Sequence, residues 1–261
     1  MPTREPFDGE SLLAFLAARA IPGVEEVGGG RYRRTAPFGI FEARPGAAGV
    51  SFAPAEAADS CRRLFDLDAD PAAVTAVLGA DPLLAPLVAR RPGLRVPGAF
   101  DPFELVVRAI VGQQVSVAGA RTVLGRLVAE YGEPLASGEG DAAARAARGA
   151  LTHHFPTAAA VATADPAAFP FPRTRANALI TVAQLAASQE LELEALVEIP
   201  GIGPWTASYV AMRALGDRDA FPPGDVGIRN ALAALGASAD DERWRPWRSY
   251  AVMHLWRSLD G

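Results

Sequence analysis

The chain has 261 residues and a formal net charge of −5, with hydrophobic residues making up 50% and charged residues 21%. This balance indicates a folded globular protein and excludes a mainly disordered chain. The single cysteine, Cys61, excludes an internal disulfide and a cysteine-ligated iron–sulfur cluster.

The first part of the sequence predicts a small α/β module over residues 1–72. Apolar residues recur at helical spacing over 7–20, which predicts a helix. Residues 31–54 then alternate in character and turn at glycine-rich points, which is typical of antiparallel strands. The start carries no apolar signal region, and the apolar run after residue 81 is broken by prolines and arginines. We therefore expect a cytoplasmic protein without a membrane span.

Beyond residue 57 the sequence predicts helices almost exclusively. Asp, Ser, Pro and Gly punctuate the helical periodicity and mark where the helices begin and end. The predicted helices are 58–67, 70–79, 101–132, 141–153, 157–164, 174–187, 189–198, 204–216, 226–235 and 243–258. The fold class is therefore α+β, with the small module at 1–72 followed by a larger helical domain at 73–261.

The basic residues are unevenly distributed, and all 25 of them are arginine. Six arginines lie within 90–126 against Asp101 and Glu104, and four lie within 243–257 without any acid. A single surface arginine needs no ligand, but two basic segments on an acidic protein are consistent with a phosphate-binding face. The absence of lysine excludes Schiff-base chemistry on a lysine amine.

The three histidines show no metal-ligand spacing. His153 and His154 are adjacent and His254 lies far from them in the sequence. We expect the adjacent pair to lie in a solvated loop rather than on a metal.

Residues 199–207, IPGIGPWTA, separate two predicted helices by a very short turn. Gly201 permits the turn, Gly203 stands where the second helix begins, and Pro204 suits its first position. A helix start presents unpaired N–H groups, and glycine keeps side chains out of the way. Such a turn can bind phosphate without reading base sequence, although it can also simply connect two helices.

Two further features follow this turn. Trp205 and Tyr209 are four residues apart and share one helix face, either as core or as part of a site. Asp225 stands after two prolines and a glycine, at the start of another predicted helix. Alone, it reads as an N-cap, but an aspartate there is also a carboxylate held in place by backbone donors.

With Leu196 before it and Thr206-Ala207 after it, the turn matches the helix-hairpin-helix motif that clamps a DNA backbone. Over nearly its whole length the chain resembles the helix-hairpin-helix DNA glycosylases, and among them the alkylation-repair group of the DNA-3-methyladenine glycosylase II type. Other matching strings are FLAARAIPGVEEV, RLFDLDADP, RPGLRVPGAFDPFELVVRAIVGQQVS and WRPWRSYAVMHLW. The resemblance implies a sheet module like half of a TATA-binding protein, then two helical subdomains with a cleft between them.

The resemblance also implies roles for individual residues. Asp225 matches the catalytic aspartate, and Gln114 matches a residue wedged into the duplex in place of the flipped base. The base-pocket positions are Phe15, Trp205, Tyr209 and Trp256. Backbone amides near Gly201, Gly203 and Thr206 would hold phosphate. No cofactor is required, but main-chain carbonyls would hold a monovalent cation, Na+ or K+, at Val197, Ile199 and Ile202.

The implied activity is that of a monofunctional glycosylase acting on double-stranded DNA as a monomer in the bacterial cytoplasm, at the nucleoid. It would flip out alkylated purines of the 3-methyladenine or 7-methylguanine type and leave an abasic site. Such purines are cationic, so electron-rich rings attract them and they leave without a strong general acid.

Two alternatives stay open. A non-catalytic hairpin protein would bind duplex DNA and use Asp225 only as a helix cap, while a glycosylase for uracil or deaminated purines would release neutral bases. The chain also departs from familiar members of the group at Val226, Arg257 and Gln114, where an aromatic, a tyrosine and a leucine can stand. These departures leave the pocket's shape and substrate range open.

Overall fold

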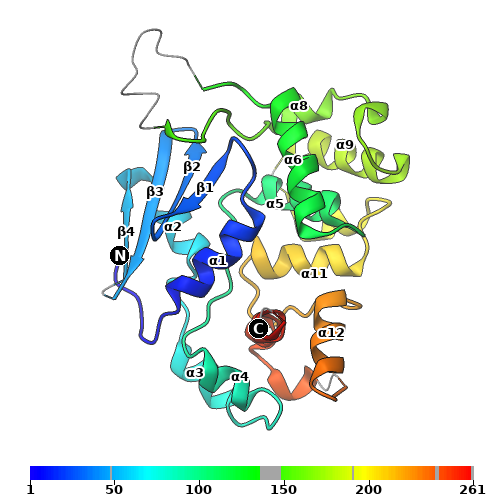
Figure 1. Ribbon diagram of the computed structural model, residues 1–261. Helices are drawn as coiled ribbons and strands as arrows, with labels where there is room; N and C mark the ends of the chain where they lie inside the picture. Colours follow the sequence, from blue (N-terminus) through cyan, green and yellow to red (C-terminus); the bar gives the residue numbers. More distant parts are fainter. Residues whose placement is uncertain (48, 136–147, 190, 239–240, 260–261) are drawn as a thin grey trace.

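The computed structural model describes residues 1–47, 49–135, 148–189, 191–238 and 241–259. Its N-terminal part holds helix α1 (Gly9–Arg19) and a four-stranded antiparallel sheet in the order β1-β2-β3-β4 (Figure 1). The strands are β1 (Glu25–Gly28), β2 (Arg31–Ala36), β3 (Gly39–Gly46) and β4 (Gly49–Ala53). The predicted antiparallel sheet is confirmed, and β1 is a strand that the sequence pattern missed.

One face of the sheet forms the core of this part. Tyr32 pairs with Ala43 and Arg34 with Phe41, so these four side chains share that face. Helix α1 and helix α2 (Ala58–Leu64), which follows the short turn η1 (Ala55–Ala57), contribute apolar side chains to the same core. The apolar spacing along 7–20 is explained by this packing.

The remaining elements are almost all helical. They are α3 (Pro71–Leu78), α4 (Ala85–Arg90), α5 (Pro102–Gly112), α6 (Val117–Tyr131), α8 (Ala158–Ala162), η2 (Pro166–Ala168), α9 (Arg173–Ser188), α10 (Leu193–Val197), α11 (Pro204–Arg213), α12 (Val226–Ala234), η3 (Asp241–Trp244) and α13 (Arg248–Ser258). None of the helices in the described ranges is long and apolar enough to cross a membrane.

Two separate cores divide the helices into two groups. Helices α5, α6, α8 and α9 enclose one core, and α3, α4, α12 and α13 enclose the other. Helix α11 lies between them in Figure 1 and contributes Val210 to the first core and Met212 to the second. The α+β fold with two helical subdomains is therefore confirmed, and α11 is the element that both subdomains share.

Several predicted helices differ in extent from the observed ones. The predicted helix 101–132 is two helices, because Gln114 has a left-handed backbone (φ 60°) and Ser116 caps the start of α6 with its hydroxyl. The predicted helix 243–258 begins only at Arg248, after η3 and a cis bond before Pro246. Helix α4 is a helix that the sequence pattern does not predict; proline fits the first turn of a helix, where Pro86 stands.

The predicted helices 141–153 and 189–198 also differ in extent from what the structure shows. Residues 141–147 and residue 190 lie outside the described residues. Of the part that is described, residues 149–153 are not helical, and His153 forms an isolated bridge with Pro134. The second helix is shorter than predicted and covers only α10.

A buried ion network joins the sheet to α5. The Arg34 guanidinium donates to both carboxylate oxygens of Glu104, at 3.2 and 2.5 Å, and Arg108 bonds both Glu104 and Glu25. Burial alone would raise the pKa of Glu104, but the two guanidinium groups hold it below its usual range. Arg108 also donates to the carbonyl of Arg19 at the end of α1. The network therefore fixes both the sheet and α1 against the helical part.

Candidate active site

The hairpin between α10 and α11 presents an open helix start. Gly201 has φ 100°, a conformation that strongly favours glycine. Gly203 caps α11, and beyond its own chain neighbours no atom of the described residues lies within 4 Å of the position that a Cβ would take there. Pro204 occupies the first turn, as predicted. The hairpin thus has the geometry of a backbone phosphate site, and the roles of both glycines toward DNA stay predictions.

Gln113 connects this hairpin to the loop that follows α5. Its Nε2 donates to the Gly201 carbonyl and to Thr206 Oγ1, both at 3.0 Å. Thr206 is buried, so its side chain serves this contact rather than the surface. The next residue, Gln114, is exposed and has φ 60°, which sets it at the tip of the loop. No sequence pattern singles out Gln113, although it stands beside Gln114 in GQQVS.

Asp225 begins α12 and occupies its N-cap position, as the sequence pattern predicts. Its Oδ1 accepts the backbone N–H of Ile228 at 2.8 Å. Two indole groups also donate to the same carboxylate: Trp256 Nε1 to Oδ1 at 2.9 Å and Trp205 Nε1 to Oδ2 at 2.8 Å. Asp225 is therefore both a helix cap and the acceptor for two aromatic side chains from α11 and α13.

The four predicted pocket residues form one continuous aromatic cluster beside this carboxylate. Trp205 and Tyr209 stack with ring centroids 5.1 Å apart and planes at 11°. Tyr209 then lies 6.3 Å from Trp256, which stacks on Phe15 at 6.4 Å. Trp205, Tyr209 and Trp256 are half-buried, whereas Phe15 is 5% exposed and packs against the Trp256 ring. The structure brings all four predicted pocket residues together with Asp225.

Two arginines that the sequence analysis did not select lie behind the cluster. Arg213 Nη1 donates to the Tyr209 hydroxyl at 2.7 Å, and its guanidinium lies 4.7 Å from the Phe15 ring centroid. Arg19 lies 3.7 Å from the same centroid. Burial raises the pKa of Tyr209, but the charges of Arg213, Arg19 and Arg108 outweigh it, so the pKa lies below its ordinary value. The cluster therefore lies in a positive field.

The residues whose carbonyls are predicted to hold a cation stand at the end of α10 and in the hairpin that follows it. The Ile199 carbonyl accepts the N–H of Ile202 at 3.0 Å, and both side chains are buried, whereas Val197 is 45% exposed. A role for these carbonyls toward a cation stays a prediction. In the described ranges no group of three or more His, Cys, Asp or Glu side chains is arranged for a metal.

The adjacent histidines and two of the positions that depart from familiar members of the group differ in how exposed they are. His153 and His154 are half-buried, and His153 Nδ1 lies 2.9 Å from Thr152 Oγ1. Val226, which follows Asp225, is 56% exposed, and Arg257 is half-buried.

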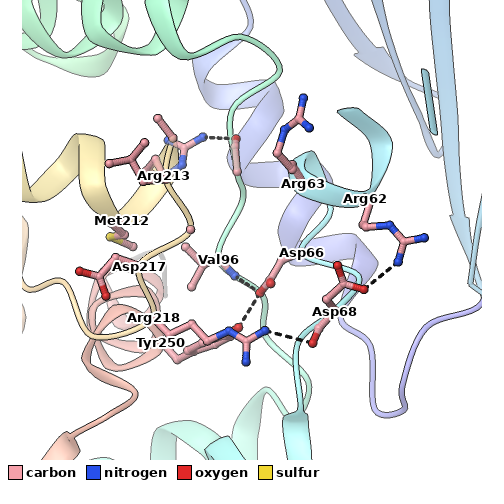
Figure 2. Close-up of a pocket in the computed structure, with 14 residues that line it drawn as sticks. Arg62, Arg63, Asp66, Asp68, Val96, Met212, Arg213, Asp217, Arg218 and Tyr250 are labelled. Atoms are coloured by element: carbon pink, nitrogen blue, oxygen red, sulfur yellow. Dashed lines mark hydrogen bonds and ion pairs between the residues drawn. The ribbon is translucent and has the colours of Figure 1, made fainter. Parts of the chain in front are cut away.

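A cavity of about 190 Å³ lies at the C-terminal end of α11 and is lined there by Met212 and Arg213 (Figure 2). Asp66 accepts the Val96 N–H at 3.2 Å and the Tyr250 hydroxyl at 2.8 Å there. Arg62 pairs with Asp68 at 2.8 Å, and Arg218 donates to the Asp68 carbonyl. Because these charged side chains form hydrogen bonds or ion pairs within the protein, we assign the residues of the cavity wall a structural role, which is to hold α2, α11 and α13 together.

Two relatives and one solved structure show what the chain is similar to. It is 42% identical over 289 residues to a Mycobacterium tuberculosis (strain CDC 1551 / Oshkosh) protein named "Probable bifunctional transcriptional activator/DNA repair enzyme AlkA", with 100% of the chain but 56% of that protein covered. The chain thus spans about half the length of this relative. It is 36% identical over 283 residues to DNA-3-methyladenine glycosylase 2 of Escherichia coli (strain K12), covering 96% and 94% of the two chains.

The fold is also that of a solved 3-methyladenine DNA-glycosylase from Archaeoglobus fulgidus. The two structures share a TM-score of 0.78 at 21% identity, over 100% of this chain and 97% of the other. Among protein families, residues 1–101 match the AlkA N-terminal domain, and residues 107–248 match the HhH-GPD superfamily of base excision DNA repair proteins. The second match covers more than half of the chain, and the chain therefore belongs to the HhH-GPD superfamily of base excision DNA repair proteins.

Proposed function

We propose that the chain is a monofunctional DNA glycosylase that flips alkylated purines, of the 3-methyladenine and 7-methylguanine type, out of double-stranded DNA and excises them. The observation that carries this proposal is the carboxylate of Asp225 at the edge of a half-buried aromatic cluster, beside the exposed hairpin. The name of the Escherichia coli relative supports the same substrate class. The protein would act as a monomer in the bacterial cytoplasm.

Binding and base extrusion fall to the hairpin and the loop after α5. The amides near Gly201 and Gly203 would hold a phosphate, and carbonyls at the hairpin would hold Na+ or K+. A base inside a duplex is inaccessible, so Gln114 would fill the gap that the extruded base leaves. Its position at an exposed tip is consistent with insertion into DNA.

The chemistry requires one carboxylate and one water. The glycosidic bond breaks, its electron pair stays with the base nitrogen and neutralises the cationic base, and positive charge develops at the sugar. Asp225 would stabilise that charge, and a water would attack the sugar carbon and give its proton to the carboxylate. The products are a free base and an abasic site. Without lysine in the chain, no lysine adduct can form to cut the strand.

A second candidate is the release of neutral, deaminated bases. The guanidinium groups of Arg213 and Arg19 lie beside the cluster, and their charge opposes a cationic base there. This observation favours neutral, deaminated purines over cationic bases in the cluster and is the reason to keep this candidate beside the first.

The test is release of free base from three duplexes, containing 7-methylguanine, hypoxanthine or no lesion. Alkylated-purine specificity predicts faster release of 7-methylguanine. Faster release of hypoxanthine supports the second candidate, and binding of every duplex without release supports a non-catalytic protein.

A further inference from the structure

The carboxylate of Asp225 is almost fully occupied by N–H donors. A carboxylate offers about four lone-pair positions, two on each oxygen. Oδ1 accepts both the Ile228 N–H at 2.8 Å and Trp256 Nε1 at 2.9 Å, which fills its two positions. Among the described residues, Oδ2 accepts a hydrogen bond only from Trp205 Nε1, at 2.8 Å. One position therefore remains, and it is on Oδ2.

Gly227 provides the room that this arrangement needs. A Cβ at position 227 would lie 2.8 Å from Cδ1 and 3.0 Å from Nε1 of Trp256, and 3.1 Å from Asp225 Oδ1. Gly227 lies in the first turn of α12 and has no positive φ, so the backbone does not demand glycine there. Glycine is also a poor helix former. The contact with the Trp256 ring is thus the reason for a glycine at this position.

Tyr209 packs against both indole rings. It stacks on Trp205 at 5.1 Å and lies 6.3 Å from Trp256, while Arg213 holds its hydroxyl. The two indoles are therefore restrained by ring packing as well as by their bonds to the carboxylate. Hydrogen bonds to a charged acceptor are short and directional, so the pair also restrains Asp225.

We infer that Trp205 and Trp256 are positioning residues for Asp225, that Gly227 makes the Trp256 contact sterically allowed, and that Oδ2 is the oxygen that acts. This inference rests on the proposed glycosylase activity and adds to the indoles a role that a base-stacking ring alone does not have. Oδ2 would face the developing charge on the sugar and take the proton of the attacking water. No bond forms between Asp225 and the sugar in this scheme.

The main experiment compares single-turnover base release and duplex affinity, using a duplex that contains 7-methylguanine. The variants are Trp256→Phe, Trp205→Phe, Gly227→Ala and the double variant Gly227→Ala/Trp256→Phe. Phenylalanine keeps an aromatic ring and removes the N–H donor. We expect each single variant to lose about 10- to 100-fold in release rate, since small displacements of a catalytic group have effects of that size.

The double variant separates positioning from general damage. If Gly227 acts only through the Trp256 N–H, the double variant loses no more activity than Trp256→Phe alone. Losses that multiply, or single variants with wild-type rates, overturn the inference. Matched controls are Trp247→Phe and Gly28→Ala, because Trp247 packs on Tyr250 and a Cβ at Gly28 meets nothing within 4 Å. Both controls should release base at the wild-type rate.

A second measurement does not depend on activity. In the wild type, the indole N–H signals of Trp205 and Trp256 should exchange slowly with deuterium, and Gly227→Ala should speed exchange at Trp256 at least as much as at Trp205. Slow exchange with no base release by the wild type would disprove the proposed function, but it would leave standing the hydrogen bonds by which the two indoles hold Asp225. Fast exchange at both indoles in the wild type would disprove the positioning of Asp225 by Trp205 and Trp256. A folded Gly227→Ala variant with unchanged exchange would overturn the role of Gly227.

Discussion

The side-chain amide of Gln113 lies 3.0 Å from the hydroxyl of Thr206, although the two residues are 93 positions apart in the chain. The same amide donates to the Gly201 carbonyl. One side chain therefore sets the spacing between the hairpin, which would hold the DNA backbone, and Gln114, which would enter the duplex. Removing it should loosen the two DNA-contacting segments relative to each other.

Gln113→Ala is expected to weaken binding to an abasic-site duplex by about 5- to 10-fold, because a lost hydrogen bond of this kind contributes about 1 kcal/mol. Fluorescence anisotropy at fixed salt would measure the affinity. Gln189→Ala, at the exposed end of α9, is the matched control and should bind as the wild type does. Unchanged affinity in Gln113→Ala would show that the contact does not couple the two segments.

The buried network on α5 should control the stability of the whole chain. Glu104→Gln leaves the buried Arg34 guanidinium without its charged partner and takes from Arg108 one of its two carboxylate partners, the other being Glu25. Breaking a buried pair in this way costs about 3–5 kcal/mol in free energy of unfolding. Urea denaturation would measure it. Asp68→Asn removes the exposed pair with Arg62 and should cost about 1 kcal/mol or less. Equal losses in the two variants would contradict the assigned importance of burial.

His254 should make the protein sensitive to acid. Burial lowers its pKa from 6.5 to about 4, against a smaller opposite effect of Asp8. As pH falls from 6.5 towards 4, the unfolded chain takes up a proton on this histidine before the folded protein does, so the folded state loses stability, by up to about 3 kcal/mol. Below pH 4 both states are protonated and the loss is complete.

The measurement is the unfolding free energy of wild type and His254→Leu at pH 7 and pH 4.5. Burial raises the pKa of Asp66 to about 6, which acts in the opposite direction over the same range, but this effect is present in both proteins and cancels in the comparison. The wild type should lose stability relative to the variant on acidification. A difference that does not change with pH would contradict the assignment.

The parts of the site that could be predicted from sequence are those that the chain holds contiguously. The turn glycines, Pro204 and the N-cap Asp225 each follow from a local rule about helix ends. The stacking of Trp205 on Tyr209 follows from their spacing on one helix face. The resemblance then placed Phe15 and Trp256 with them, and the structure brings all of these residues together.

What sequence reasoning missed depends on how distant segments are oriented. The indole N–H bonds to Asp225 come from residues 20 and 31 positions away, and no spacing rule gives their direction. In the sequence, Arg213 is simply an arginine in the last turn of a helix. Its contact with the Phe15 ring depends on how α11 packs against α1, which no local pattern gives. The break at Gln114 was missed because glutamine rarely adopts a left-handed backbone, and the nearby Gly112 is the last residue of α5 rather than the residue that turns the chain.

The most direct test of the account is base release by Asp225→Asn beside the wild type. Asparagine still caps a helix, so α12 should persist while the charge is lost. We expect the variant to bind a 7-methylguanine duplex normally and to release base at least about 100-fold more slowly, as expected when charge stabilisation of the transition state is removed. Asp70→Asn, at the N-cap of α3, is the matched control and should keep full activity. Equal release by Asp225→Asn and the wild type would show that Asp225 is only a helix cap and would contradict the proposed mechanism.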